Sequence, residues 1–215
     1  MAFAALVLSA CGGGSRQDAS EPSGNFTVAV TQAQFPVSQR LAQHTRLVIA
    51  VHNTSGKTIP DIAISICNVT CAYQNNGTAG QGTSAEAFAE DLGTQYVANP
   101  SRPVWVVDRP PGPCGPGPSG YSCRSGGAGG AVTGYANTWA LGALKPGATA
   151  RFAWAVTAVK AGKHVVAWQV AAGLNGKAKA VLADGSIPRG TFTVAITRAP
   201  QRSYVTDSGK IVPTQ

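Results

Sequence analysis

Five cysteines carry the most distinctive chemistry in this chain, since thiols can form disulfides, bind zinc or accept a covalent lipid. Four of them, Cys67, Cys71, Cys114 and Cys123, form two close pairs with three and eight residues between the partners. Ribbon-like zinc sites pair their cysteines across two residues, so the spacing favours two disulfides over a zinc site. Three connectivities exist, and Cys67–Cys71 with Cys114–Cys123 closes the shortest loops. Because a straight strand would hold Cys67 and Cys71 about 13 Å apart, their bond requires a bend in the chain.

The fifth cysteine, Cys11, ends a short apolar segment at the start of the chain. The residues Leu-Ser-Ala that precede it are of the type found at signal cleavage sites. This segment resembles a bacterial lipobox, in which the cysteine becomes the lipidated first residue of the mature protein. The resemblance implies a signal peptide over residues 1–10, a flexible tether over 11–24 and an extracytoplasmic location on the cytoplasmic membrane. No basic residue precedes the apolar run, which departs from the usual signal pattern.

The charge balance points to anionic partners outside the cell. Lys and Arg number 17 against 9 Asp and Glu, which gives a formal net charge of +8. An anionic membrane surface or an acidic wall polymer would attract such a chain. The cations are dispersed and the chain is expected to be exported, so we expect no nucleic-acid partner. No apolar run approaches 18 residues, so no membrane-spanning helix is expected.

Residue patterns of enzymes are sparse. No Ser has Gly at both −2 and +2, and no His-Glu-x-x-His occurs. A blue-copper site needs a cysteine near two histidines, and no Cys lies within ten residues of His44, His52 or His164. We therefore interpret these as surface or packed histidines and expect no enzymatic activity, no metal and no cofactor. Calcium binding remains open at three separate carboxylates, Asp61, Asp91 and Asp184.

Aromatic side chains are the candidates for recognition. Tyr121 and Tyr135 lie in or beside a Gly/Pro-rich stretch, where an exposed ring could contact sugar or protein. Trp105 has the opposite parity to Val104 and Val106, so either face of that strand can be the buried one. We take Tyr121, Tyr135 and Trp105 as candidate binding residues.

Period-2 alternation of apolar residues dominates the rest of the chain and predicts strands. The seven clear segments are 26–30, 47–51, 62–66, 104–108, 152–156, 166–170 and 192–196, and weaker ones occur at 137–141 and 177–182. Helical signal is confined to residues 84–92. The pattern predicts an all-β, Ig-like β-sandwich of about seven to nine strands over residues 25–199, with a C-terminal tail over 200–215.

Two long loops interrupt the predicted sandwich, at residues 68–102 and 110–138. Residues 110–131 contain five Pro and eight Gly in 22 positions, so no strand ladder is expected there. Long loops in compact domains usually carry function or are disordered. We therefore expect the functional surface at the loop-rich end of the sandwich.

Two sequence stretches resemble bacterial surface Ig-like domains of the CARDB-like, conserved-repeat kind. They are LVIAVHNTSGKTIPDIAISI (47–66) and WALGALKPGATARFAWAVT (139–157). The resemblance implies a sandwich that spaces, supports or adheres, with catalysis rare. The expected function is a membrane-anchored extracytoplasmic lipoprotein with a non-catalytic binding or structural role, towards a protein or cell-wall component. Two alternatives are a carbohydrate-active or hydrolase-accessory protein with a cleft at the loop end, and an accessory module of an exporter or secretion complex.

Overall fold

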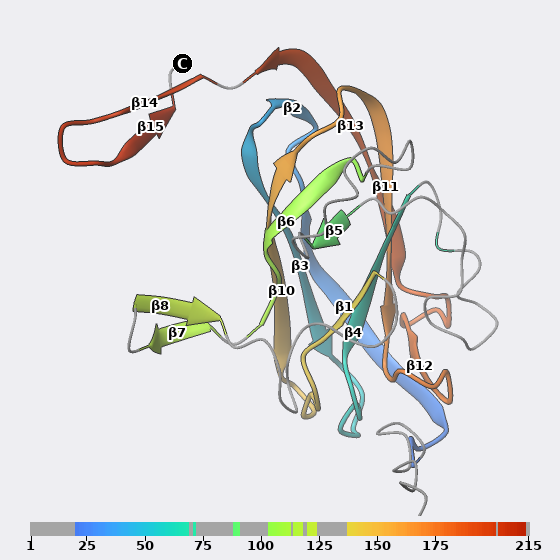
Figure 1. Ribbon diagram of the computed structural model, residues 1–215. Coiled ribbons are helices and arrows are strands. Elements are labelled where there is room, and N and C mark those ends of the chain that lie inside the picture. The colour runs from blue at the N-terminus through green and yellow to red at the C-terminus, as the bar shows by residue number, and fades with distance from the viewer. Residues whose placement is uncertain are drawn as a thin grey trace, which may run out of the picture.

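Two β-sheets packed face to face form the body of the protein (Figure 1). The computed structural model describes residues 20–68, 71, 88–90, 103–112, 114–117, 120–123, 137–200 and 202–213. Every regular element within these ranges is a strand, as predicted for an Ig-like sandwich. No helix in the described part of the chain has the length and apolar character needed to cross a membrane.

The larger sheet has six strands in the order β12-β1-β3-β10-β6-β5, and the smaller has five in the order β2-β13-β11-β4-β9. The larger sheet consists of β12 (Ala178–Val181), β1 (Gly24–Gln34), β3 (His44–Asn53), β10 (Thr149–Ala158), β6 (Trp105–Arg109) and β5 (Phe88–Glu90). The smaller consists of β2 (Ser38–Leu41), β13 (Arg189–Pro200), β11 (Gly162–Ala171), β4 (Ala63–Asn68) and β9 (Thr138–Ala140). Two separate hairpins are β7 (Cys114–Gly117) with β8 (Gly120–Cys123), and β14 (Ser203–Val205) with β15 (Ile211–Pro213).

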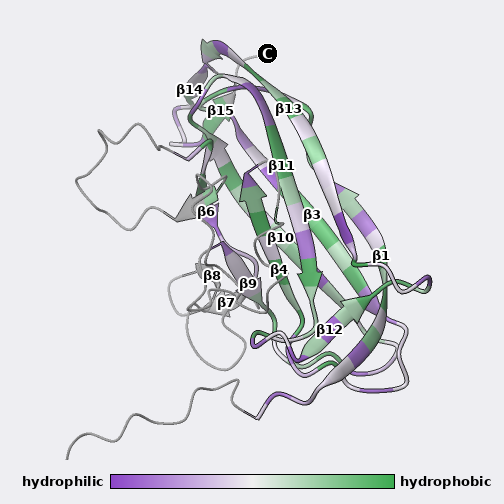
Figure 2. Ribbon diagram, turned by 90° about the vertical axis from the view of Figure 1, so that its right-hand side faces the viewer, coloured by the Kyte–Doolittle hydropathy of each residue, from purple (hydrophilic) through white to green (hydrophobic). Residues whose placement is uncertain are grey.

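The pairing of β3 with β10 forms the middle of the larger sheet. Nine consecutive residues of each strand pair in antiparallel register, from His52 opposite Thr149 to His44 opposite Thr157. Because side chains alternate along a strand, Leu47, Ile49 and Val51 enter the core, and their neighbours face outward. Figure 2 shows the resulting bands of hydrophobic and hydrophilic residues along the strands. The alternation in the sequence is therefore explained by burial of one face of each sheet.

All seven segments with clear alternation lie in or overlap strands, namely β1, β3, β4, β6, β10, β11 and β13. The two weaker segments contain β9 and β12. The predicted helix over residues 84–92 is wrong where the structure describes it, because residues 88–90 form β5 and pair in parallel with β6. Phe88 is 1% exposed in the aromatic core, so tertiary packing outweighs the local helical preference.

The Gly/Pro-rich stretch also differs from expectation, since residues 114–117 and 120–123 form a short antiparallel ladder. A two-stranded hairpin leaves one edge of each strand unpaired, so a proline can be accommodated where its missing N–H faces away from the partner. Pro116 lies opposite Tyr121 in this ladder. Residues 114–117 and 120–123 are therefore more regular than the sequence indicates.

Aromatic rings from both sheets meet between them. Phe88 packs edge-on against Trp105 and Trp154, with ring centroids 5.8 and 6.4 Å apart. The indole N–H of Trp105 donates to Oε1 of Gln39 at 2.8 Å, and Gln39 Nε2 donates to the carbonyl of Pro36, also at 2.8 Å. Gln39 is only 1% exposed, so these bonds satisfy polar groups that would otherwise be stranded in the core.

Replacing Gln39 by Ala should lower the free energy of unfolding by about 1–3 kcal/mol, because the buried indole N–H of Trp105 loses its acceptor. Urea unfolding measures this difference. The control is Gln34→Ala, which removes an exposed side chain bonded only to Gln32 and should change stability by less than about 0.5 kcal/mol. Equal effects of the two substitutions would contradict the role assigned to Gln39.

Candidate functional site

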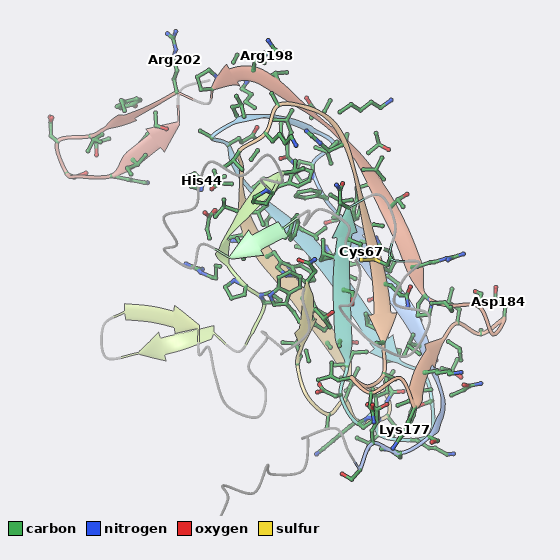
Figure 3. All side chains as sticks on the ribbon, turned by 45° about the vertical axis from the view of Figure 1, so that its right-hand side comes forward. His44, Cys67, Lys177, Asp184, Arg198 and Arg202 are labelled. Carbon is green, nitrogen blue, oxygen red and sulfur yellow. A yellow bond between two sulfur atoms is a disulfide. The ribbon has the colours of Figure 1, made fainter. Side chains whose placement is uncertain are left out.

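Cys67 and Cys71 form a disulfide, as their spacing predicts. Their Cα atoms lie 5.3 Å apart, and β4 ends at Asn68, so the expected bend is present. Cys67 and Cys71 pack with Ala167 of β11 in a small buried cluster separate from the main core. Figure 3 labels Cys67 on its strand, with its sulfur at the disulfide. The disulfide therefore fixes the chain where it leaves the sandwich for the long segment 68–102.

The other predicted site residues of the loop end are only partly described. The backbones of Cys114 and Cys123 are direct partners in the β7–β8 ladder, as a bond between them would need, and their side chains lie outside the described part. The side chain of Tyr121 and all of Tyr135 also lie outside it. Trp105 is fully buried, so it is a core residue rather than the surface binding residue that the sequence suggested. Strand parity left open which face of this strand is buried, and the structure buries the face that carries Trp105.

A polar cluster joins three strands on the outer face of the six-stranded sheet. Thr157 Oγ1 of β10 donates to the Asp108 carboxylate of β6, at 2.7 and 2.9 Å from its two oxygens. His44 Nδ1 of β3 lies 2.8 Å from Thr157 Oγ1 and 3.1 Å from Asp108 Oδ2. The side chain of His44 is 78% exposed. The cluster therefore cross-links β3, β10 and β6 at the surface.

The same three residue types occur in hydrolytic triads, but their geometry here is different. In a triad, one ring nitrogen of the histidine faces the carboxylate and the other takes the proton of the hydroxyl nucleophile. Here Nδ1 of His44 faces both Asp108 and Thr157. One nitrogen cannot be oriented by the carboxylate and also accept the hydroxyl proton. The cluster is thus suited to binding and to strand cross-linking, and not to proton transfer from Thr157.

Next to this cluster, three arginines surround small side chains on the same sheet face. Ala155 of β10 pairs with Arg46 on one side and with Arg109 on the other. Arg151 lies further along β10 on the same face, beyond Ala153. All three arginines are exposed. We call Arg46, Arg109, Arg151 and the small residues between them the arginine face.

A β-bulge brings Arg109 to this face. The register between β10 and β6 shifts between Ala155 and Val156, so Val107 pairs with Val156 while Arg109 pairs with Ala155. The extra residue is Asp108, and both Asp108 and Arg109 are exposed. Without the bulge, the alternation that buries Trp105 and Val107 would turn Arg109 inward. Sequence periodicity could not reveal this arrangement.

The outer face of the five-stranded sheet also carries cations, namely Lys163, Arg189 and Arg40. Lys163 pairs with Ala195, whereas Arg189 pairs with Gln169, six residues along β11 and therefore about 20 Å away. Arg40 lies on the edge strand β2, opposite Thr197. Exposed cations thus lie on the outer faces of both sheets, and the three of the arginine face surround a floor of small side chains.

The N-terminal segment is fastened to one end of the sandwich. The Glu21 carboxylate accepts the backbone N–H groups of Asn175 and Ala178, both at 2.7 Å. A Cβ at Gly173 would meet this carboxylate, so a larger residue there would displace the Glu21 side chain from these hydrogen bonds. The predicted tether of residues 11–24 is therefore attached to the body from Glu21 onward.

Asp61 lies at the same end and accepts the N–H of Gly142 at 2.9 Å. Burial raises the pKa of the Asp61 carboxyl, and the negative charge of Glu21 raises that pKa further. No group of three or more potential metal ligands occurs among the described residues. Of the three carboxylates considered for calcium, Asp61 and Asp184 are described, and Asp184 instead bonds the N–H and hydroxyl of Ser186.

No protein-family model and no curated protein sequence matches the chain. Solved structures do match at low identity. The CARDB domain of a Pyrococcus furiosus protein, crystallised in complex with di-metal ions, has a TM-score of 0.39 and 10% identity over 80% of this chain and 93% of that one. A PapD-like domain of human CEP192 has a TM-score of 0.36 and 11% identity over 93% and 98% of the two chains. Native alpha-2-macroglobulin of E. coli has a TM-score of 0.38 and 9% identity over 84% of this chain and 8% of its own.

CARDB is also the family that residues 47–66 and 139–157 resemble in sequence. The β-sandwich implied by that resemblance is confirmed by the strand order and pairing of this chain itself.

Replacing both Cys67 and Cys71 by Ser should lower the free energy of unfolding by about 2 kcal/mol, the value expected for closing so short a loop in the unfolded chain. Urea unfolding of the oxidised protein and of the double variant measures the loss. Adding a reductant should lower the stability of the parent protein much more than that of the double variant, which has no Cys67–Cys71 bond to lose. An undiminished stability in the double variant would contradict a structural role for this bond.

Replacing Asp61 by Asn should stabilise the protein at pH 7. Folding raises the pKa of Asp61. The contribution of Asp61 to the free energy of unfolding is therefore favourable below the unfolded pKa near 3.8 and is lost as the pH rises through the folded pKa. Asn keeps an oxygen that can accept the Gly142 N–H but carries no charge. The gain in thermal stability should therefore shrink as pH falls below about 4.

The control for this prediction is Asp184→Asn, for which the opposite sign is expected. Hydrogen bonds from Ser186 lower the pKa of Asp184, so its ionised form is favoured in the folded protein and neutralising it should destabilise at pH 7. Melting curves of both variants over pH 3–7 give the comparison. If both substitutions shift the melting temperature in the same direction at neutral pH, the electrostatic account of Asp61 is incorrect.

Proposed function

We propose that the chain is a membrane-anchored extracytoplasmic lipoprotein whose β-sandwich has a non-catalytic binding role at the cell surface. The observation that carries this proposal is the disulfide between Cys67 and Cys71. Disulfides persist in oxidising compartments and are rare in the cytosol of mesophiles. The lipobox-like segment before Cys11 supplies the corresponding route of export and anchoring.

The attachment of Glu21 supports an anchored role. Nine residues separate Cys11 from Glu21, and the ten extended steps between them reach about 35 Å. Because Glu21 is bound to the loop at 175–178, the lipid on Cys11 would hold this end of the sandwich within that distance of the bilayer. A lipid-anchored domain of this kind presents its sheet faces and hairpins to components of the cell envelope.

The geometry of the surface supports binding rather than catalysis. The His44, Asp108 and Thr157 cluster lacks the arrangement needed for hydroxyl activation. Loops and exposed sheet faces on a rigid scaffold are common places for recognition. The exposed arginines of the six-stranded sheet lie on three neighbouring strands whose register is fixed. They provide a stable surface for a partner.

Intact-mass analysis of the protein isolated from its native membrane tests the anchoring. The expected result is a chain that begins at Cys11 and carries a diacylglycerol thioether. Alkylation should add no group to the native protein and four groups after reduction, if Cys114 and Cys123 are bonded as well as Cys67 and Cys71. A Cys11→Ser control should lose the lipid mass and leave the Cys67–Cys71 bond in place. An unmodified N-terminus with free thiols would contradict the proposal.

A further inference from the structure

We propose that the arginine face binds a linear polyanion of the cell envelope, a glycan or polyol chain that carries phosphate or carboxylate groups. The proposal rests on the proposed function for its extracytoplasmic location. It assigns a surface, which the sequence alone did not indicate, to the anionic polymer that the net charge suggested. The three residues that carry it are Arg46, Arg109 and Arg151.

The first argument is the spacing of the guanidinium groups. Arg46 and Arg109 lie on either side of Ala155 in one row across β3, β10 and β6. Two strand spacings put their Cα atoms about 10 Å apart. Arg151 lies four residues from Ala155 along β10, which is about 13 Å. The three long side chains can therefore reach different oxyanion groups of one extended chain.

The second argument is the shape of the surface between the arginines. Ala153 and Ala155 are half-buried, and Val48 and Ala50 beside them are 6% exposed. None of these side chains rises above the sheet as far as an arginine does. Val48 and Ala50 are closed to solvent, so a polymer backbone can contact the sheet at Ala153 and Ala155 while its anionic groups meet the guanidinium groups from the sides.

The third argument is that the charges have no partner among the residues that the structure describes. None of the three arginines forms an ion pair or a side-chain hydrogen bond with another residue that the structure describes. Asp108 is the only carboxylate described on this face, and it is already bonded to Thr157 and His44. Guanidinium groups bind phosphate and carboxylate in a bidentate manner. Each of these exposed arginines can therefore present its guanidinium group to such an anion.

The surroundings of the face favour a linear chain over a flat membrane. Figures 1 and 3 show the hairpins β7–β8 and β14–β15 projecting on one side of the body, and Figure 3 shows His44 on that same side. His44 is the outward residue that precedes Arg46 in the alternation of β3. A flat bilayer would meet the projecting hairpins before it reached the floor at Ala153 and Ala155. A single polymer chain can lie between the hairpins.

Binding titrations test the proposal in solution. The protein is the chain from position 11 with Cys11→Ser, which keeps all described residues and separates ligand binding from lipidation. The probes are poly(glycerol phosphate) for phosphodiesters, polygalacturonate for carboxylates, and neutral dextran. We expect saturable binding to at least one polyanion, at least tenfold weaker in 500 mM than in 50 mM salt, and none to dextran.

A matched pair of charge variants identifies the face. The triple variant R46Q/R109Q/R151Q should bind the polyanion about tenfold or more weakly. The triple variant R40Q/K163Q/R189Q removes the same charge from the opposite sheet and should stay within about twofold of the parent. Unchanged melting temperatures confirm that both variants are folded. Arg→Lys substitutions at the same three positions keep the charge and should still weaken binding, because lysine lacks the bidentate fork.

Three results would overturn the proposal. These are no binding to either polyanion, equal weakening in the two triple variants, and tighter association with vesicles containing phosphatidylglycerol than with either polymer. The last result would assign the face to the membrane surface. Because lipidation of Cys11 is measured separately by mass, each of these results leaves the anchoring proposal to be judged by its own test.

Discussion

The antiparallel register of β3 on β10 is the constraint on which the rest of the structure depends. It pairs Leu47 with Trp154 and Ile49 with Phe152 on the inner face, and all four side chains are fully buried. A shift of β10 by one residue would turn those aromatic rings to solvent and bring Arg151 into the core. The free-energy cost of burying an unpaired guanidinium there would far exceed any gain from local contacts. The hydrophobic core and the arginine face are thus two results of one register.

The remaining contacts hold this central pair in place and connect it to the chain ends. Gln39 satisfies the indole of Trp105 where the edge strand β2 faces β6, and Phe88 extends the core under β5. Glu21 secures the N-terminal segment to the loop that contains Asn175. The sandwich consequently connects the predicted lipid anchor to the proposed binding surface.

The sequence predicts the parts of this structure that depend on simple periodicity. Alternation is enough to find seven strands, because each sheet has one buried face, and close spacing is enough to find the Cys67–Cys71 bond. Residues 88–90 were misassigned to a helix because their strand pairing depends on Trp105, a distant residue. The arginine face could not be predicted, since Arg46, Arg109 and Arg151 are far apart in sequence and Arg109 reaches the face only through a bulge.

Arginine footprinting tests the central claim most directly. The protein is modified with an arginine-specific dicarbonyl reagent, with and without poly(glycerol phosphate), and the modified positions are quantified by mass spectrometry. The account predicts that Arg46, Arg109 and Arg151 react in the free protein and become protected together by the polymer, while Arg40 and Arg189 stay reactive. Slow reaction of the three arginines in the free protein, or equal protection of Arg40 and Arg189, would contradict it.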